Sequence, residues 1–368
     1  MPSLRFVLTS LTLVAVAAVA VAAQVGVRQL TLPRRPAVEP WMTRILENPG
    51  QSGLRLRHFN VTTRDGYQLQ ALMADPTAKA GATARGRPIV KALKAAGLAG
   101  SASGSGSGTD DPEPRGTVIL LHGMSTRKEN MLPVAERFAA AGFRCILYDS
   151  RGHGDSSGVH VTYGTYETED LRRVLLEAKK MAGLRGLGPV GLFGYSLGGA
   201  VALQAQPGLP EVKAVCSVSA FAELSPVVSG QAENLWNGIA SRLLPVVRFE
   251  TWLQAGFDPF SVSPLASAAQ VTCPVLLVHG LKDNLVPVQQ ARNLAAALGP
   301  HCRDTILVPA GTHGGIFTEG GEALQQRIAV FFARELAPPR ALPAEPAAVS
   351  KSKSKPKTKV RAKAIASR

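Results

Sequence analysis

Short apolar runs alternate with helix-forming stretches along most of this 368-residue chain. The runs are typical of strands that are buried on both faces of a sheet, and they lie at residues 117–121, 144–148, 189–193, 212–217, 273–278 and 305–308. Amphipathic stretches favour helices between and after them, at residues 131–141, 167–182, 197–206, 288–298 and 322–336. This alternation predicts an α/β fold, with a mostly parallel central sheet covered by helices on both faces.

Other segments depart from this alternation. Residues 54–62 and 67–74 alternate apolar and polar positions around Arg64-Asp65-Gly66, which predicts a hairpin. Residues 77–116 include a Ser/Gly repeat and predict a flexible insertion with at most one short helix near residues 89–98. Residues 221–270, which carry Trp236 and Trp252, predict a small cap after the sixth strand. We expect these two tryptophans to contact substrate; the alternative is a packed excursion that touches none.

The two ends of the chain differ from the domain at residues 54–336. Residues 1–28 predict a signal peptide or a membrane anchor, because residues 6–23 are uninterruptedly apolar or small and Val21-Ala22-Ala23 is an acceptable cleavage site. Residues 29–53 read as a linker, and residues 337–368 as a disordered basic tail. These features favour an anchored or exported protein. The arginines after the apolar segment, at positions 28, 34 and 35, outnumber Arg5, so the topology stays open.

The net charge of +15 belongs to the appendages rather than to the domain. Residues 350–368 carry +8, residues 1–49 and 77–116 carry +3 each, and the remainder carries only +1. A near-neutral domain argues against a specific nucleic-acid partner, which would need clustered Lys and Arg on folded structure. The tail is either solubilising or contacts an anionic surface. Among four cysteines, Cys145 and Cys216 lie in buried runs, and Cys273 and Cys302 would form one disulfide if their strands were neighbours.

The strongest chemical signal is Gly194-Tyr195-Ser196-Leu197-Gly198, between a strand and a helix. A serine on such a strand-turn-helix junction is a nucleophile elbow: the glycines permit the tight turn and the hydroxyl projects at a helix N-terminus. A second Gly-x-Ser-x-Gly match surrounds Ser156. It lies in loop sequence without a strand before it or a helix after it, so Ser196 is the predicted nucleophile.

A serine nucleophile needs a histidine base and an acid that orients the base. His313 and Asp283 each follow a predicted strand, and catalytic groups of parallel sheets gather at the carboxyl ends of strands. Glu223 or Asp258 in the cap is the alternative acid if Asp283 only caps the helix that follows it. The other histidines lie in strands or loops without this setting. The backbone N–H groups of Leu197 and Met124 are the predicted oxyanion hole.

These motifs together resemble the α/β-hydrolase fold superfamily, among its serine aminopeptidase-like and monoglyceride-lipase-like members. The resemblance spans residues 54–336 without the insertion and rests on His122-Gly123-Met124, on residues 149–156, on the elbow, on Cys273-Pro274 through Pro287, and on His313-Gly314. It implies the order Ser196, Asp283, His313 for the catalytic residues, a non-catalytic turn at Ser156, and no cofactor or metal. The insertion, the basic tail and the cap sequence depart from the family pattern.

The sequence therefore predicts a serine hydrolase that cleaves an ester, thioester or amide bond through an acyl-enzyme. The apolar cap favours an acyl ester or lipid as substrate. A serine aminopeptidase-like enzyme, in which Glu223 and Glu233 recognise a free amino terminus, is one alternative. The other is a non-catalytic, anchored binding module of the same fold, because a fold alone does not fix a function.

Overall fold

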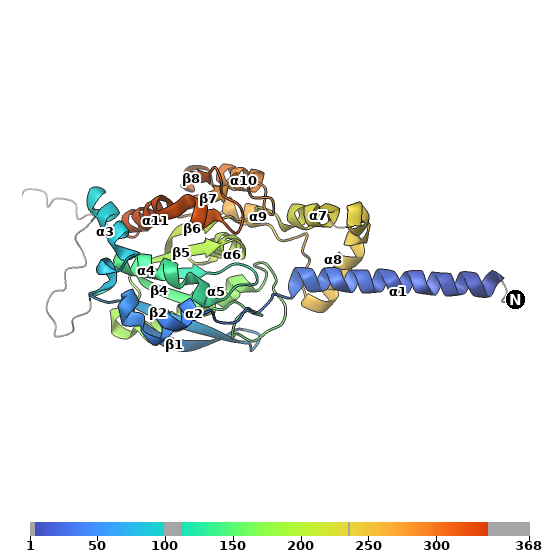
Figure 1. Cartoon of the computed structure of the whole chain (residues 1–368), viewed down its shortest axis with the longest axis horizontal. Coiled ribbons are helices and arrows are strands. Elements are labelled where there is room, and N and C mark those ends of the chain that lie inside the picture. The colour runs from blue at the N-terminus through green and yellow to red at the C-terminus, as the bar shows by residue number, and fades with distance from the viewer. Residues whose placement is uncertain (1–3, 99–111, 235, 338–368) are drawn as a thin grey trace, which may run out of the picture. The chain divides into compact units, whose positions relative to one another are not determined.

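The computed structural model describes residues 4–98, 112–234 and 236–337, with the backbone alone at residues 236, 237 and 239. The centre of the predicted insertion and the predicted basic tail, from residue 338 onward, lie outside the described residues. Figure 1 shows an open sheet with helices on both sides. The α/β class that the sequence predicts is confirmed.

Eight strands form the sheet in the order β1-β2-β4-β3-β5-β6-β7-β8. They are β1 (Leu54–Thr62), β2 (Gln68–Pro76), β3 (Thr117–Leu121), β4 (Arg144–Tyr148), β5 (Val190–Tyr195), β6 (Val212–Val218), β7 (Val275–Gly280) and β8 (Cys302–Val308). β2 is antiparallel to both of its neighbours, and the pairs from β4 to β8 are parallel. The six parallel strands need helical crossovers, which the sequence supplies between them.

Helices cover both faces of this sheet because its central strands are apolar on both sides. Ile119 and Leu121 of β3 pack into one buried cluster with α5 (Glu167–Ala182), α6 (Leu197–Ala205) and α10 (Gln289–Leu298). Val118 and Leu120 of the same strand face α3 (Gly86–Ala95), α4 (Leu132–Ala140) and α11 (Ile316–Glu335). The domain is thus a helix-sheet-helix sandwich, and its functional loops must lie at the strand ends.

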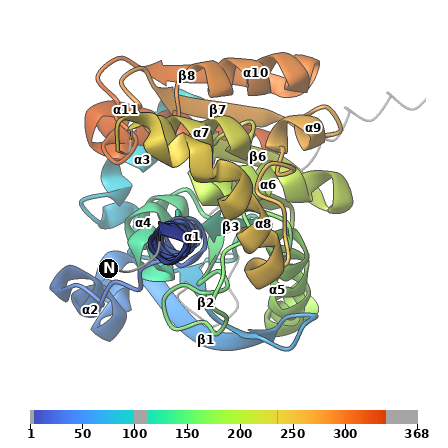
Figure 2. The ribbon, with the colours of Figure 1, turned by 90° about the vertical axis from the view of Figure 1, so that its right-hand side faces the viewer.

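The predicted cap after the sixth strand is helical. It contains α7 (Leu224–Asn234), the 3-10 helix η6 (Trp236–Leu243), α8 (Leu244–Ala255) and α9 (Pro264–Ala268). Figure 2 shows α8 beside α1 (Leu4–Thr31), which is seen end-on. Phe249, Trp252 and Leu253 of α8 are each more than half exposed. This part of the cap therefore keeps an apolar surface that the domain itself does not cover.

Two predicted connecting segments are more ordered than the sequence suggests. The predicted linker at residues 29–53 contains the end of α1, α2 (Pro40–Glu47) and η1 (Pro49–Ser52). Met42 and Ile45 of α2 are buried, because their spacing places both on one helix face. In the insertion, Ile89 and Leu93 of α3 are likewise buried, four residues apart, against α4 and α11. The one short helix that the sequence allows in the insertion is α3, and the linker and the insertion stay predictions as domain boundaries.

All four cysteines are free thiols. Cys273 lies just before β7, and Cys302 begins β8. These strands are neighbours, which was the condition for a disulfide, but Cys302 is paired with Val275 and not with Cys273. Burial raises the pKa of the Cys273 thiol to about 12, which keeps it protonated and unreactive. The disulfide that the sequence allows between Cys273 and Cys302 is therefore absent from the described residues.

Candidate active site

The candidate site lies where the direction of the sheet's connections changes. The chain runs from β3 outward to β4 and returns to β5 on the other side of β3, so the loops after β3 and β5 diverge. Leu121 at the end of β3 is paired with Gly194 near the end of β5. The loops that hold Met124 and Ser196 therefore leave the sheet side by side, at the crevice where open α/β sheets place their ligands.

Ser196 occupies a strained turn between β5 and α6. Its φ of 52° and ψ of −115° lie in a region that L-residues rarely adopt. A side chain at Gly194 would collide with the backbone of Gly198, and a side chain at Gly198 would collide with the carbonyl of Leu121. The Ser196 N–H donates to the carbonyl of Val218 at 2.7 Å, which holds the turn against β6. The two glycines of the motif are thus required by close approach of the backbone.

The structure brings three of the predicted residues into one hydrogen-bonded chain. Ser196 Oγ lies 2.8 Å from His313 Nε2, and His313 Nδ1 lies 2.7 Å from Asp283 Oδ2. Because an ionised carboxylate only accepts, Nδ1 carries the proton and Nε2 is free to accept the hydroxyl proton. The Asp283 side chain is fully buried and that of His313 is 17% exposed. This arrangement can take a proton from Ser196 and return it to a leaving group.

The Asp283 carboxylate is held by its own loop. Its Oδ1 accepts hydrogen bonds from the N–H groups of Leu285 and Val286, at 3.0 and 2.8 Å, which leaves Oδ2 for His313. Asp283 does not cap α10, whose N-cap is Val288. His279 lies nearby but is buried and donates from Nε2 to the carbonyl of Val286. Burial lowers the pKa of His279, so this second imidazole stays neutral and packs at the strand end.

The segments that carry the two predicted oxyanion donors adjoin Ser196. Leu197 begins α6, where the first N–H groups of a helix have no partner in a preceding turn. Gly123 packs on the elbow: a Cβ at this position would lie 3.5 Å from Ser196 Cβ and 2.9 Å from the Tyr195 ring. Met124 follows Gly123 directly. The loop and the helix terminus are therefore both available to bind negative charge that develops near Ser196.

His122 holds the base of the oxyanion loop in a neutral, buried form. Its Nε2 accepts from the Ser150 N–H at 3.0 Å, so Nδ1 carries the proton and donates to the Gly123 carbonyl at 2.8 Å. Burial lowers the pKa of His122 to about 4. The imidazole of His153 lies edge-to-face with that of His122 at a centroid distance of 5.0 Å, and burial lowers its pKa to about 3. Protonation of His122 would convert Nε2 from a hydrogen-bond acceptor into a donor that faces the Ser150 N–H, and this hydrogen bond would be lost.

We therefore expect acid to destabilise the fold through His122. Its folded pKa lies below the ordinary value of 6.5, so between pH 6.5 and 4 the unfolded chain binds more protons. The free energy of unfolding should fall by about 3 kcal/mol over this range from His122 alone. Urea unfolding at stepped pH measures this, with the exposed His58→Gln as a variant that keeps the wild-type slope. A proton resonance of His122 that titrates near pH 6.5 would contradict the assignment.

The structure separates the remaining candidates from this site. Ser156 is buried: its Oγ donates to the Asp149 carbonyl and accepts from the Gln70 N–H, at 2.7 and 2.9 Å. Asp258 pairs with Arg248 at 2.6 Å, and Glu223 is exposed at the start of the cap. In the described part of the chain, no hydrogen bond or ion pair joins either carboxylate to His313. Ser156 is thus structural in its contacts, as its loop context suggests.

The two tryptophans that the sequence suggests as substrate contacts are not placed in the site. Trp252 is 56% exposed on α8, and its ring lies 6.0 Å from that of Phe249. The side chain of Trp236 lies outside the described residues, and Glu233 is exposed on α7.

Sequence reasoning missed Tyr195. Its hydroxyl donates to the His313 carbonyl at 2.7 Å, so the residue next to the nucleophile also fixes the loop that carries the base. Burial, followed by the charge of Asp283, raises the Tyr195 pKa to about 12, which keeps this donor protonated. The Gly-x-Ser-x-Gly motif allows any residue before the serine. No sequence signal therefore identifies Tyr195 as the residue that holds the His313 loop.

Comparison with known proteins agrees with the fold. The family model described as serine aminopeptidase, S33, matches residues 112–264. A monoacylglycerol lipase of Mycolicibacterium smegmatis is 32% identical over 218 residues, covering 50% of this chain and 76% of that protein. The uncharacterized protein YqkD of Bacillus subtilis is 31% identical over 183 residues, covering 48% of this chain and 58% of that protein. The solved Pyrococcus furiosus esterase Pf2001 is similar in fold, with a TM-score of 0.58, 19% identity, and coverage of 83% and 98% of the two chains.

The chain belongs to the α/β-hydrolase superfamily. The extent of its match to the mycobacterial lipase carries this assignment, and the eight-stranded sheet agrees with it. The membership places the protein among the hydrolases.

Proposed function

We propose that the protein is a serine hydrolase that uses Ser196, His313 and Asp283 as its catalytic residues. The observation that carries the proposal is the continuous hydrogen-bonded chain from Ser196 Oγ through the His313 imidazole to the buried Asp283 carboxylate. The strained backbone at Ser196 supports it, because such strain is tolerated where it positions a reactive group.

The proposed reaction is acyl transfer in two halves. Ser196 Oγ attacks the substrate carbonyl as His313 Nε2 accepts the hydroxyl proton, and the N–H groups of Leu197 and Met124 bind the oxyanion. His313 then donates its proton to the leaving alcohol, which leaves an ester on Ser196. Water attacks this ester in the second half, with His313 again as the base, and Ser196 is restored. No cofactor or metal takes part in these steps.

The proposed substrates are acyl esters, with lipids preferred over charged molecules. The cap exposes Phe249, Trp252 and Leu253, and an apolar surface of this kind suits contact with a lipid phase. Cleavage of a peptide or another amide is the second candidate, which the match to the serine aminopeptidase family favours. Glu223 is exposed at the start of the cap, where it could bind a free amino terminus.

The proposed setting of the enzyme is a membrane. Among the described residues, one helix, residues 5–31, is long and apolar enough to cross a bilayer, and it is compatible with a signal anchor or a signal peptide. We propose that residues 54–336 form the hydrolase domain, that residues 1–28 attach it to a membrane or direct its export, and that the basic tail contacts anionic surfaces.

A fluorophosphonate probe tests the proposed function. The full chain should be labelled at Ser196, and Ser196→Ala should remove the labelling, whereas Ser156→Ala should keep it. A folded protein that the probe does not label, or labelling that survives Ser196→Ala, would favour the non-catalytic binding module. A matched pair of ester and amino-terminal peptide substrates then separates the two kinds of hydrolase by kcat/KM.

A further inference from the structure

Helix α1 does not stop at the cleavage site that its sequence offers. It continues through Ala23 to Thr31. Ala23 and Val27 are each 1% exposed and form a small buried cluster with Val247 of α8. Gly26 also lies against α8, because a Cβ there would come within 2.9 Å of Val247 Cγ2. The last third of α1 is therefore packed on the cap as part of the domain.

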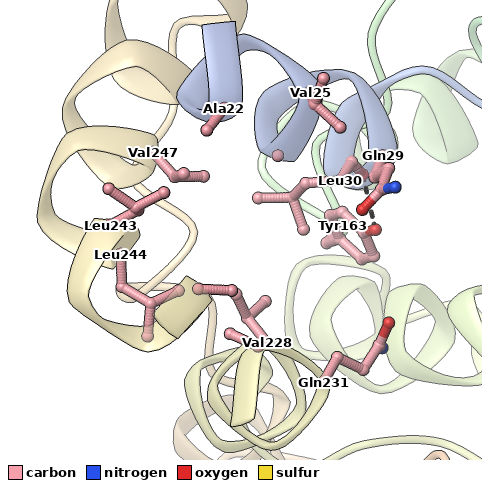
Figure 3. A pocket seen from close by; sticks show the side chains of 13 residues that line it. Ala22, Val25, Gln29, Leu30, Tyr163, Val228, Gln231, Leu243, Leu244 and Val247 are labelled. Carbon is pink, nitrogen blue, oxygen red and sulfur yellow. Dashed lines mark hydrogen bonds between the residues drawn. The ribbon is translucent and has the colours of Figure 1, made fainter. Parts of the chain in front are cut away.

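A cavity of about 200 Å³ lies between this part of α1 and the cap (Figure 3). Ala22, Val25 and Leu30 of α1 line one side, and Val228, Leu243 and Leu244 of the cap line another. Tyr163 closes one end, with its hydroxyl donating to the Leu30 carbonyl at 2.7 Å. An apolar cavity of about 150 Å³ is large enough to bind benzene. This cavity therefore has room for several methylene groups of an acyl chain.

Neither Ser196 nor His313 lines the cavity, but apolar packing links the two places. Tyr163 and Val228 of the cavity wall pack against the same buried cluster as Met124 of the predicted oxyanion loop. The Tyr163 carbonyl accepts from Gln204 Nε2 on α6, the helix that begins after Ser196. The chain that leaves α1 also reaches the oxyanion loop, where the Arg34 N–H donates to Ser125 Oγ at 3.0 Å.

The remainder of α1 has the properties of a bilayer-embedded segment. Residues 4–21 are helical, and the side chains of residues 5–21 are almost all exposed although most are apolar. Eighteen helical residues span about 27 Å, close to the hydrocarbon thickness of a bilayer of about 30 Å. The exposed Phe249, Trp252 and Leu253 lie on α8, which packs against α1. The cavity thus lies where an embedded helix meets the domain.

We propose that residues 22–30 of α1 are a permanent part of the enzyme and form, with the cap, a binding site for the acyl chain of a lipid substrate. The proposal rests on the proposed function and adds that the N-terminal helix is retained and determines acyl-chain selection. The ester carbonyl lies at Ser196, and the distal part of the chain occupies the cavity. Removal of residues 1–23 would take Ala22 from the cavity wall and Ala23 from the buried cluster with Val247.

Two substitutions in opposite directions test the site. Ala22→Trp fills the cavity from α1, and Leu244→Ala enlarges it from the cap. Each methylene withdrawn from apolar contact weakens binding about fourfold. With full-length enzyme in bilayer nanodiscs, Ala22→Trp should lower kcat/KM for decanoyl esters about sixteenfold and leave butyryl esters within about twofold, given that two methylenes are displaced. Leu244→Ala should shift the preferred chain to greater length.

The neighbouring residue supplies a matched control. Val21 is 64% exposed and does not line the cavity. Val21→Trp therefore introduces the same side chain about 100° around the helix axis from Ala22, outside the cavity. This variant should keep the wild-type dependence on acyl length. Equal profiles for Ala22→Trp, Leu244→Ala and wild type would overturn the proposal while the labelling of Ser196 left the proposed function intact.

A second readout needs no catalysis. In Ser196→Ala protein in nanodiscs, a decanoic acid with a terminal diazirine should crosslink to peptides that contain residues 22–30 and 228–247. Addition of Ala22→Trp should reduce this crosslinking about sixteenfold, and addition of Val21→Trp should not. Crosslinks that are unchanged by Ala22→Trp would overturn the proposal even if the protein proved not to be a serine hydrolase. Mature protein from its host that begins after Ala23 would overturn it as well.

Discussion

Replacing Ser196 by alanine is expected to lower kcat for an ester substrate by about 10⁴- to 10⁶-fold, with little change in KM. The hydroxyl is the proposed nucleophile, and without it no acyl-enzyme forms. The oxyanion donors and substrate contacts remain, so a small residual rate over water is expected. Steady-state kinetics with a chromogenic short-chain ester measures the loss.

Ser156→Ala is the matched control for this loss. It removes the same hydroxyl from the same five-residue pattern, but from a buried turn that is hydrogen-bonded to β2. Its kcat should stay near the wild-type value, and its melting temperature should fall because two hydrogen bonds are lost. A double variant of Ser196→Ala and His313→Ala should be hardly slower than Ser196→Ala alone, since the two residues act as a unit. A Ser196→Ala loss below about tenfold would contradict the proposed mechanism.

Asp283→Asn is expected to lower kcat by about 10⁴-fold without unfolding the protein. The asparagine oxygen can still accept from the Leu285 and Val286 N–H groups, so the loop keeps its shape. The amide nitrogen, however, would donate to His313 Nδ1. That bond reverses the imidazole tautomer and leaves a proton on Nε2, facing Ser196 Oγ, where the mechanism needs an acceptor.

Asp258→Asn and Glu223→Gln are the matching controls, because each changes a carboxylate that the sequence offers as an alternative acid. Both should keep kcat within about twofold, since the carboxylate that is hydrogen-bonded to His313 is that of Asp283 and surface changes of this kind have small effects. If Asp283→Asn lost less than tenfold while one of these variants lost far more, the acid of the site would have to be reassigned. Circular dichroism and melting temperature check that each variant is folded.

The fold and the arrangement of the candidate site follow from local sequence to different degrees. The apolar runs around Ser196 predict a strand before it and a helix after it, and β5 and α6 lie there. Asp283 and His313 could be expected near Ser196 because parallel strands bring their carboxyl ends to one edge. The side-chain contacts that complete the arrangement, such as the Tyr195 hydroxyl on the His313 carbonyl, depend on tertiary packing and carry no local signal.

The N-terminal region could not be predicted for a physical reason. Its apolar pattern is the same whether the helix ends in a bilayer, is removed, or packs on protein. The buried positions Ala23 and Val27 become distinctive only beside Val247, more than two hundred residues away in the chain. Similarly, Pro/Arg-rich sequence suggested an open linker at residues 32–40, although Arg35 donates to the carbonyls of Gly152 and Gly158 at 2.9 and 2.8 Å.

These bonds have a mechanical consequence. The Thr31 carbonyl accepts from the Val161 N–H, and Arg127 donates to the Pro36 carbonyl at 3.2 Å, so the chain after α1 is clamped at several points. If α1 is embedded, the domain cannot reorient freely relative to the membrane. The helix then fixes the depth and the tilt of the domain at the membrane surface. Enzyme and substrate would then meet by diffusion within the plane of the bilayer. The reaction velocity would depend on the mole fraction of substrate in the bilayer rather than on its concentration in the buffer.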